Sequence, residues 1–143
     1  MEYDEFIRRV QEEAELAAPD EAAAATEAVL GTLGEMLSPM ERGHLAAQLH
    51  KSLKEYVTEW MEHPSKEKGR PHRFRLAEFY NRVAARSEVR YPTAVKRSQA
   101  VMKVLREAVA PGELAHMFRE LPQEYEELRT GTPRSPASPT VVQ

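Results

Sequence analysis

The chain has 143 residues, 41% of them hydrophobic and 30% charged, which is typical of a helical protein with a single domain. It contains no cysteine, which excludes disulfide bonds, thiol nucleophiles and thiolate metal sites and suits a reducing cytosol. No apolar run approaches 18 residues, and the N-terminus carries Glu2 and Asp4 where a signal peptide would be basic, so we expect a cytoplasmic protein without a membrane partner.

The net charge of −3 conceals three blocks of different sign. Residues 1–65 carry 14 anions and five cations, whereas residues 66–106 carry three anions and 12 cations. Residues 107–143 are again acidic, with six anions and three cations. A basic block of this size creates a strong local field, so we expect it to face an acidic counterpart inside or outside the molecule.

Apolar residues recur with the 3.6-residue period of helices from the start of the chain. The first stripe begins at Tyr3 and ends near Leu16. Pro19 then begins an alanine-rich second helix, in which Gly31 and Gly34 are expected to be mild liabilities because glycine is a weak helix former.

Residues 38–41, Ser-Pro-Met-Glu, have the pattern of a capping box with proline at the first helical position. They predict a short third helix that ends near Leu49, and a fourth apolar stripe covers residues 53–61. Four more helices are predicted after residue 72, the last of them beginning at Pro122. No segment alternates with the period of two that a half-buried strand requires, so no strand is predicted.

The second half of the chain repeats the first, in a register that slips by one residue. The matching pairs are Glu5 and Glu78, Phe6 and Phe79, Arg9 and Arg82, Val10 and Val83, Pro39 and Pro111, Glu41 and Glu113, His44 and His116, and Leu49 and Leu121. An internal repeat determines the architecture before any chemistry is considered. Because a unit of roughly 55 residues has a marginal core, we expect the two repeats to pack on each other.

These signals predict an all-α fold made of two tandem four-helix repeats, packed as one domain with pseudo-twofold symmetry. The first repeat takes residues 1–62 and the second takes residues 73–129. Residues 63–72 form a basic linker between them. Residues 130–143 are rich in Pro, Ser and Thr and are predicted to be a disordered tail, because they hold too few apolar side chains to form a core.

The repeated pattern Glu-Phe-x-x-Arg-Val, followed by Ala-Val and Leu, by Pro-x-Glu and by Leu121-Pro122, resembles a bacterial family known as domain of unknown function 2267. The resemblance covers residues 3–129, including the duplicated layout. It implies an all-helical bacterial cytoplasmic protein and supplies no catalytic residues. The chain departs from the pattern at His50, where the first repeat lacks the proline that the second repeat has at Pro122.

His44 and His116 occupy the same position in both repeats, each three residues after a glutamate. A pseudo-twofold axis could bring the two imidazoles together to share a metal or a proton, and Glu-x-x-His is also the ligand spacing of di-iron bundles. Such bundles need further carboxylates on long helices, and Glu41 and Glu113 are explained as capping residues. We therefore favour two half-exposed positions inherited from one ancestral repeat, and predict no cofactor and no stoichiometric zinc or iron.

Catalysis has little support in the sequence. No serine stands in a glycine-framed nucleophile elbow, and no glycine-rich phosphate loop is present. The acidic run at Glu12, Glu13 and Glu15 is typical of a solvated helix face. We therefore predict that the protein is not an enzyme and has no catalytic residues.

The basic block is the strongest functional signal in the sequence. Its candidate binding residues are Lys66, Lys68, Arg70, Arg73, Arg75, Arg82, Arg86, Arg90, Lys96 and Arg97. A cationic surface of this kind binds phosphates, but it would equally compensate the acidic first repeat within the molecule or a homodimer. We favour internal compensation, and predict a non-enzymatic interaction or scaffold protein with a protein partner. The alternative is an RNA- or ribosome-associated protein that binds through the linker and the second repeat.

Overall fold

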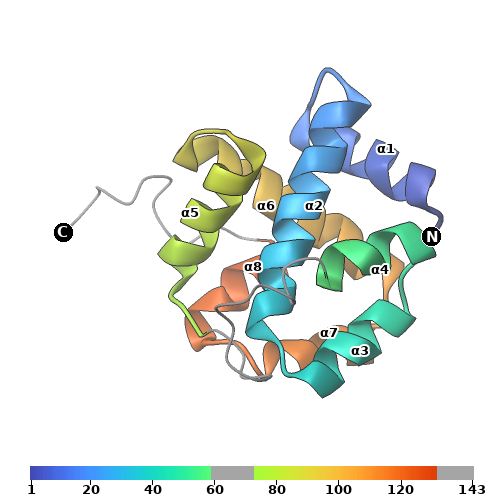
Figure 1. The fold of residues 1–143 in the computed structure, drawn as a ribbon, viewed down its shortest axis with the longest axis vertical. Helices are drawn as coiled ribbons and strands as arrows, with labels where there is room; N and C mark the ends of the chain where they lie inside the picture. Colours follow the sequence, from blue (N-terminus) through green and yellow to red (C-terminus); the bar gives the residue numbers. More distant parts are fainter. Residues whose placement is uncertain (59–72, 132–143) are drawn as a thin grey trace.

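The regular structure is entirely helical in the residues that this computed structural model describes, 1–58 and 73–131 (Figure 1). The elements are α1 (Tyr3–Ala14), α2 (Pro19–Met36), α3 (Pro39–Ala47), α4 (Lys51–Thr58), α5 (Leu76–Ser87), α6 (Tyr91–Ala108), α7 (Pro111–Phe118), the 3-10 turn η2 (Gln123–Tyr125) and α8 (Glu126–Thr130). The predicted all-α class is thereby confirmed. The predicted linker, with Lys66, Lys68 and Arg70, and residues 132–143 of the predicted tail lie outside the described residues.

Prolines and left-handed residues set many of the helix ends. Pro19, Pro39 and Pro111 begin α2, α3 and α7, at a position where the missing N–H of proline costs no hydrogen bond. α1 and α5 both end at a glutamate in the left-handed conformation, Glu15 with φ of 57° and Glu88 with φ of 59°. The first two helices of each half also share lengths of 12 and 18 residues. The local signals of the first half therefore recur in the second.

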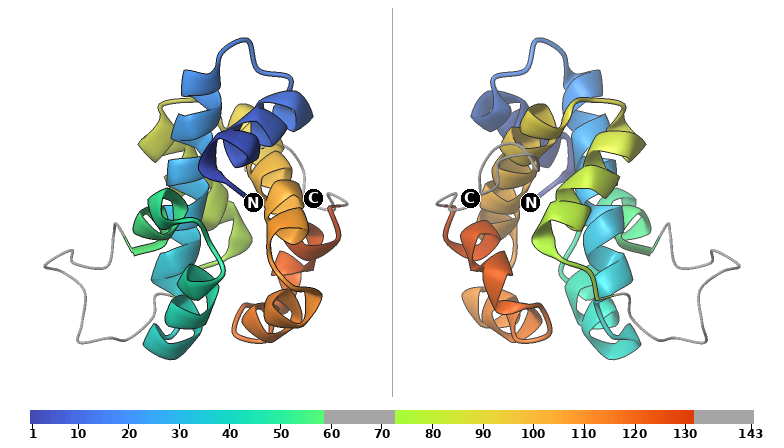
Figure 2. Two further views of the ribbon diagram at one scale, coloured as in Figure 1. Left: turned by 90° about the vertical axis from the view of Figure 1, so that its right-hand side faces the viewer. Right: turned by 90° about the vertical axis from the view of Figure 1, so that its left-hand side faces the viewer.

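The two longest helices, α2 and α6, form the centre of the molecule (Figures 1 and 2). α1 packs on both of them, and so does α5. The first helix of each half thus contacts the second helix of both halves, and the halves share one apolar core. Phe6 on α1 and Phe79 on α5 are fully buried in this core. α3 and α7 contact each other and lie together at one end of the molecule (Figure 2).

Gly34 lies where α2 packs against α4. A Cβ atom added to Gly34 would lie 2.0 Å from the backbone oxygen of Val57 and 3.1 Å from its carbonyl carbon. The interpretation of Gly34 as a mild liability is therefore wrong, because the missing side chain is what lets the two backbones approach. An added Cβ at Gly43, by contrast, would meet no atom within 4 Å.

The end of the second half differs from the single helix that was predicted from Pro122. Pro122 precedes the η2 turn, and α8 follows it. The Tyr125 hydroxyl donates to the backbone oxygen of Phe74 at 2.7 Å, and its ring packs edge-on against Phe79 with centroids 5.7 Å apart. The turn therefore places Tyr125 where it holds the start of α5 against the core.

Candidate functional site

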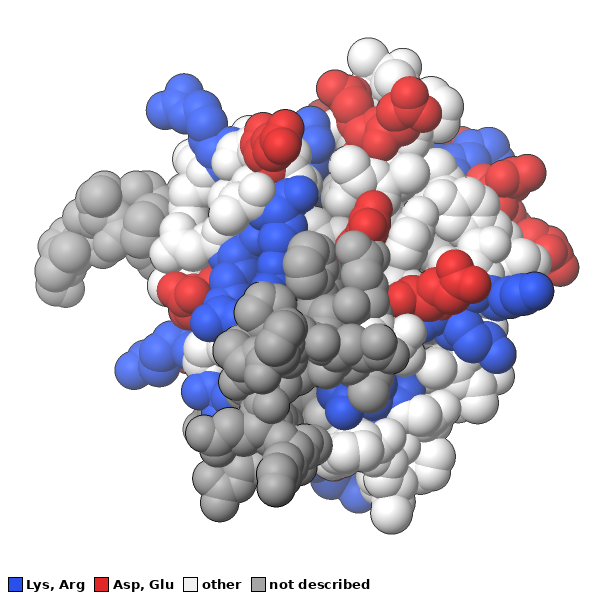
Figure 3. Space-filling model, in the orientation of Figure 1, with Lys and Arg blue, Asp and Glu red and all other residues white. Residues whose placement is uncertain are grey.

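Most of the described residues of the predicted basic block have polar partners within the molecule. The structure describes seven of its ten candidate residues, and five of these seven donate to a carboxylate or a backbone oxygen. In Figure 3, Lys and Arg side chains alternate with Asp and Glu over much of the face shown, and the largest basic group lies over α5. The described cations therefore do not form one free phosphate-binding surface.

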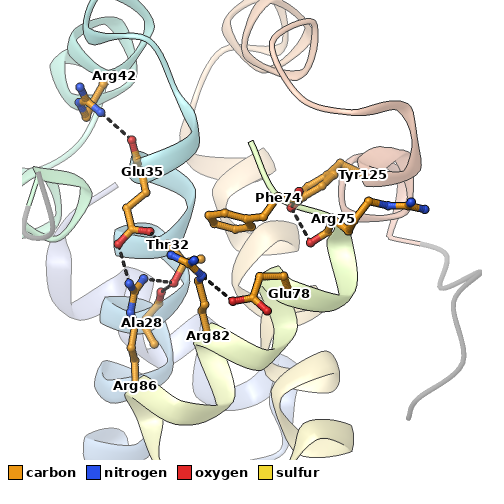
Figure 4. Close-up of polar contacts among 11 residues, drawn as sticks. Ala28, Thr32, Glu35, Arg42, Phe74, Arg75, Glu78, Arg82, Arg86 and Tyr125 are labelled. Atoms are coloured by element: carbon orange, nitrogen blue, oxygen red, sulfur yellow. Dashed lines mark hydrogen bonds and ion pairs between the residues drawn. The ribbon is translucent and has the colours of Figure 1, made fainter. Parts of the chain in front are cut away.

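The centre of this compensation is Glu35 on α2, whose side chain is only 5% exposed. Arg82 donates to one carboxylate oxygen at 3.1 Å, and Arg86 donates to the other at 2.5 Å (Figure 4). Arg86 also donates to the hydroxyl of Thr32 at 2.7 Å. The Arg82 guanidinium lies 4.3 Å from the ring centroid of Phe74, a favourable cation–π distance. Arg82 and Arg86, two members of the predicted basic block, thus bind the first half of the chain to the second.

The other described cations of the block make looser contacts. Arg75 pairs with Glu124 at 2.9 Å, Lys96 pairs with Glu15 at 3.0 Å, and Arg73 donates to the backbone oxygen of Glu120. Neither Arg90 nor Arg97 has an ion pair with another residue in the described part of the chain. Exposed single pairs of this kind contribute little to stability, so the stabilising part of the block is the buried pair at Glu35.

A Glu/His cluster lies where α3 meets α7. Nδ1 of His116 is 2.5 Å from Oε1 of Glu41, and Nδ1 of His44 is 3.8 Å from the same oxygen. The two imidazole rings have centroids 6.3 Å apart. Their side chains are 53% and 51% exposed, as the sequence analysis expected, but the fold makes them neighbours. The equivalent histidines of the two halves therefore share one site.

The capping interpretation of Glu41 is only half correct. The Ser38 hydroxyl accepts a hydrogen bond from the Glu41 backbone N–H at 3.2 Å, as the capping box predicts. The backbone N–H of Ser38, however, donates to Glu120 from the second half at 2.9 Å. The Glu41 carboxylate is 1% exposed and faces His116 instead. Because a distant residue completes the cap, the Glu41 carboxylate is free to join the cluster.

Glu113, from α7, adds a second carboxyl group to the cluster. Burial raises the pKa of Glu113 to about 7, and a hydrogen bond that its protonated carboxyl group donates to Glu41, together with electrostatic repulsion from Glu41, acts in the same direction. The Oε2 atoms of both glutamates are buried and have no donor in the part of the chain that the structure describes. Two carboxyl groups in such surroundings hold either a proton or a cation between them. The prediction of no stoichiometric zinc or iron rested partly on a capping role for the Glu41 carboxylate, which faces His116 instead. It stays a prediction.

An open pocket of about 290 Å³ lies between α1 and α2, at the acidic end of the first half. Its apolar wall comes from Tyr3, Ile7, Pro19 and Ala23, and its polar rim includes Asp4 and Asp20. This surface could not be predicted from the sequence, because its residues belong to two different helices and each apolar stripe alone is an ordinary amphipathic pattern. One sign of this surface in the sequence is that both helices carry acidic residues in their first turn.

The fold and the comparison with known families agree on the class of this protein. Residues 3–128 match the family described as "Uncharacterized conserved protein (DUF2267)". The match covers most of the chain, so this chain belongs to that family. No curated protein matches the sequence. None of the helices in the described residues combines the length and the apolarity needed to cross a bilayer.

Proposed function

We propose that the protein is a non-enzymatic binding protein of the bacterial cytoplasm, and that it binds a protein partner in the pocket between α1 and α2. The observation that carries this proposal is an apolar wall beside carboxylates that are not neutralised. Asp4 and Asp20 on the pocket rim have no ion pair with another residue in the described ranges 1–58 and 73–131. The described cations of the basic block, by contrast, mostly have partners.

The chemistry of the pocket specifies the kind of partner. The half-buried Tyr3 and the exposed Pro19 offer apolar surface in the pocket, above the buried Ile7, and the exposed Asp4 and Asp20 supply negative charge at its rim. Arg8 also lines the pocket, but its guanidinium is paired with Glu12 at 3.0 Å. A Lys- or Arg-bearing amphipathic segment would complement this surface in both polarity and charge.

The proposal is tested with two variants that remove the same amount of charge. The first replaces Asp4 and Asp20 by Asn, and the control replaces the distant Glu55 and Glu126 by Gln. Immobilised wild-type and control proteins are expected to retain a partner from nuclease-treated bacterial lysate, and the first variant is expected to lose it. The partner is then identified, and its purified basic segment is titrated calorimetrically against all three proteins.

Equal binding of that purified segment to the first variant and to the control would overturn the proposal. A partner without a basic amphipathic segment would overturn it as well. The expected affinity loss for the Asp4→Asn/Asp20→Asn protein is roughly 10- to 100-fold, and binding should weaken as the salt concentration rises because the contacts are charged.

RNA or ribosome binding remains a second candidate, supported by the 12 cations of residues 66–106. Arg90 is exposed and, among the described residues, has no acidic partner. The test is a gel shift with bulk bacterial RNA at low salt, using wild type and a variant in which Arg70, Arg73 and Arg75 are changed to Glu. Salt-sensitive binding that this variant loses, at unchanged melting temperature, would favour RNA over a protein partner.

We also infer that the two halves are copies of one helical unit related by a pseudo-twofold axis. The recurring helix lengths, the paired left-handed residues Glu15 and Glu88 and the shared histidine site support this inference. An experimental structure in which α1–α3 fail to superpose on α5–α7 would contradict it.

A further inference from the structure

The Glu/His cluster between α3 and α7 has the composition of a metal site. We propose that Glu41, His44 and His116 bind one divalent transition-metal ion of the zinc class, with Glu113 beside it. One donor atom from each of the three ligands can be chosen so that all lie within 4.8 Å of one another. Because α3 and α7 belong to different halves of the chain, the ion would join the two halves at one end of the molecule.

The distances fit an ion after small side-chain rotations. Zinc binds imidazole nitrogen and carboxylate oxygen at about 2.0–2.2 Å, so two ligand atoms of a tetrahedral site lie roughly 3.3–3.5 Å apart. Oε1 of Glu41 is 2.5 Å from His116 and 3.8 Å from His44, which are values on either side of that spacing. Glu41 and His44 are three residues apart on one helix, so they lie on the same face.

The burial of Glu41 is an independent indication of a bound cation. Its side chain is 1% exposed, and no N–H or hydroxyl group of the described residues donates to its Oε2 atom. A buried carboxylate oxygen without a partner is costly, and a dication would satisfy it. The half-exposed imidazoles of His44 and His116 provide the entry path that such a site needs.

The donor set selects the class of metal and the number of ions. Two imidazoles and a carboxylate suit zinc, cobalt, nickel or ferrous iron, whereas magnesium and calcium prefer oxygen ligands. A di-iron bundle centre uses two Glu-x-x-His motifs and two further glutamates. The cluster contains both motifs, at Glu41 to His44 and Glu113 to His116, but only Glu41, His44 and His116 have donor atoms within 4.8 Å of one another, so one ion is expected.

The experiment uses metal-free full-length protein and two probe ions. Co²⁺ is titrated with absorption spectroscopy, and Zn²⁺ is titrated by calorimetry, each with Mg²⁺ as a comparison ion. The tested variants are His44→Ala, His116→Ala, Glu41→Gln and Glu113→Gln. The matched control is His50→Asn, because His50 lies outside the cluster and its Nδ1 accepts the Ser52 N–H, a capping bond that asparagine can also make.

Wild type and His50→Asn are expected to bind one Co²⁺ or Zn²⁺ per chain, with the visible bands of four-coordinate cobalt and a higher melting temperature. His44→Ala is expected to weaken binding by at least about 100-fold, and Glu113→Gln by roughly 10- to 100-fold as a supporting residue. Because His44 is half exposed, its variant should retain the helical circular dichroism of wild type. The absence of saturable binding to wild type, equal binding by His44→Ala and His50→Asn, or equal affinity for Mg²⁺ would each overturn the proposal.

Discussion

Replacing Gly34 by Ala is expected to destabilise the protein, although alanine is the better helix former. The new Cβ would lie 2.0 Å from the backbone oxygen of Val57, well inside van der Waals contact. A backbone atom cannot rotate away as a side chain can, so α4 would have to move from α2 by about 1 Å or more, which is overpacking of a close-packed interior. Leu53 and Val57, which are 1% and 0% exposed, would lose part of their contacts.

The free energy of unfolding sets the scale of this effect. Overpacking costs about 1–3 kcal/mol, and full burial of an aliphatic side chain contributes about 1.5–3 kcal/mol. The higher helix propensity of alanine offsets about 1 kcal/mol of this cost. We therefore expect the free energy of unfolding to fall by roughly 2–4 kcal/mol. At about 2–4 °C per kcal/mol for a chain of this size, the melting temperature should fall by roughly 5–15 °C.

Urea unfolding and calorimetry on Gly34→Ala and Gly43→Ala measure this difference. Gly43 is the matched control, because an added Cβ there meets nothing within 4 Å. Gly43→Ala should therefore gain up to about 1 kcal/mol. If Gly34→Ala were as stable as wild type, with an unchanged dependence on urea, the close α2–α4 approach would be refuted.

Three other predictions concern the core, the buried ion pair and the cluster. Phe6→Ala and Phe79→Ala should each lose about 3–5 kcal/mol in urea unfolding, because both rings are fully buried; a loss below about 1 kcal/mol in either would contradict the shared core. Glu35→Ala should lower the free energy of unfolding by about 2–4 kcal/mol, because Arg86 loses its carboxylate partner and Arg82 keeps only the more exposed Glu78; high salt that removed this difference would show the pairs to be exposed. In metal-free buffer, the raised pKa of Glu113 means that the folded protein binds a proton more tightly there than the unfolded chain does. The stability that this proton contributes is complete below about pH 4.5 and is lost as the pH rises through about 7. Between pH 5 and pH 8, urea unfolding should show a smaller loss of stability for Glu113→Gln than for wild type. The comparison isolates Glu113, because Glu41 and both histidines of the cluster remain in both proteins. Parallel pH profiles of the two proteins would contradict the raised pKa of Glu113.

Much of the fold could be predicted from the sequence because it depends on local signals. The 3.6-residue period, the prolines at helix starts and the Ser38 cap all act within one or two turns of helix. They therefore predicted the helices with errors of a few residues at their ends, such as α3 ending at Ala47 where Leu49 was expected. The repeat added that the two histidines occupy equivalent positions.

The predictions failed where a residue's partner came from far along the chain. Gly34 was interpreted by propensity alone, and its role depends on Val57, which packs against it from another helix. Glu41 was interpreted as the residue that accepts the Ser38 N–H, but Glu120 accepts it instead, 82 residues further along the chain. The sequence could not show the partner of the arginines on α5, because Glu35 contacts Arg82 and Arg86 only through the packing of α5 on α2.

By itself, the sequence determined that this protein is helical, carries matching residues at corresponding positions of its two halves and is divided into blocks of opposite charge, because periodicity, spacing and composition are properties of the chain. Only the tertiary structure decided which charges meet and which face solvent, since that depends on how α5 packs on α2 and how α3 meets α7. The Glu/His cluster is the clearest case. Its residues were visible in the repeat, but the 2.5 Å contact between Glu41 and His116 exists only because packing brings the two halves together.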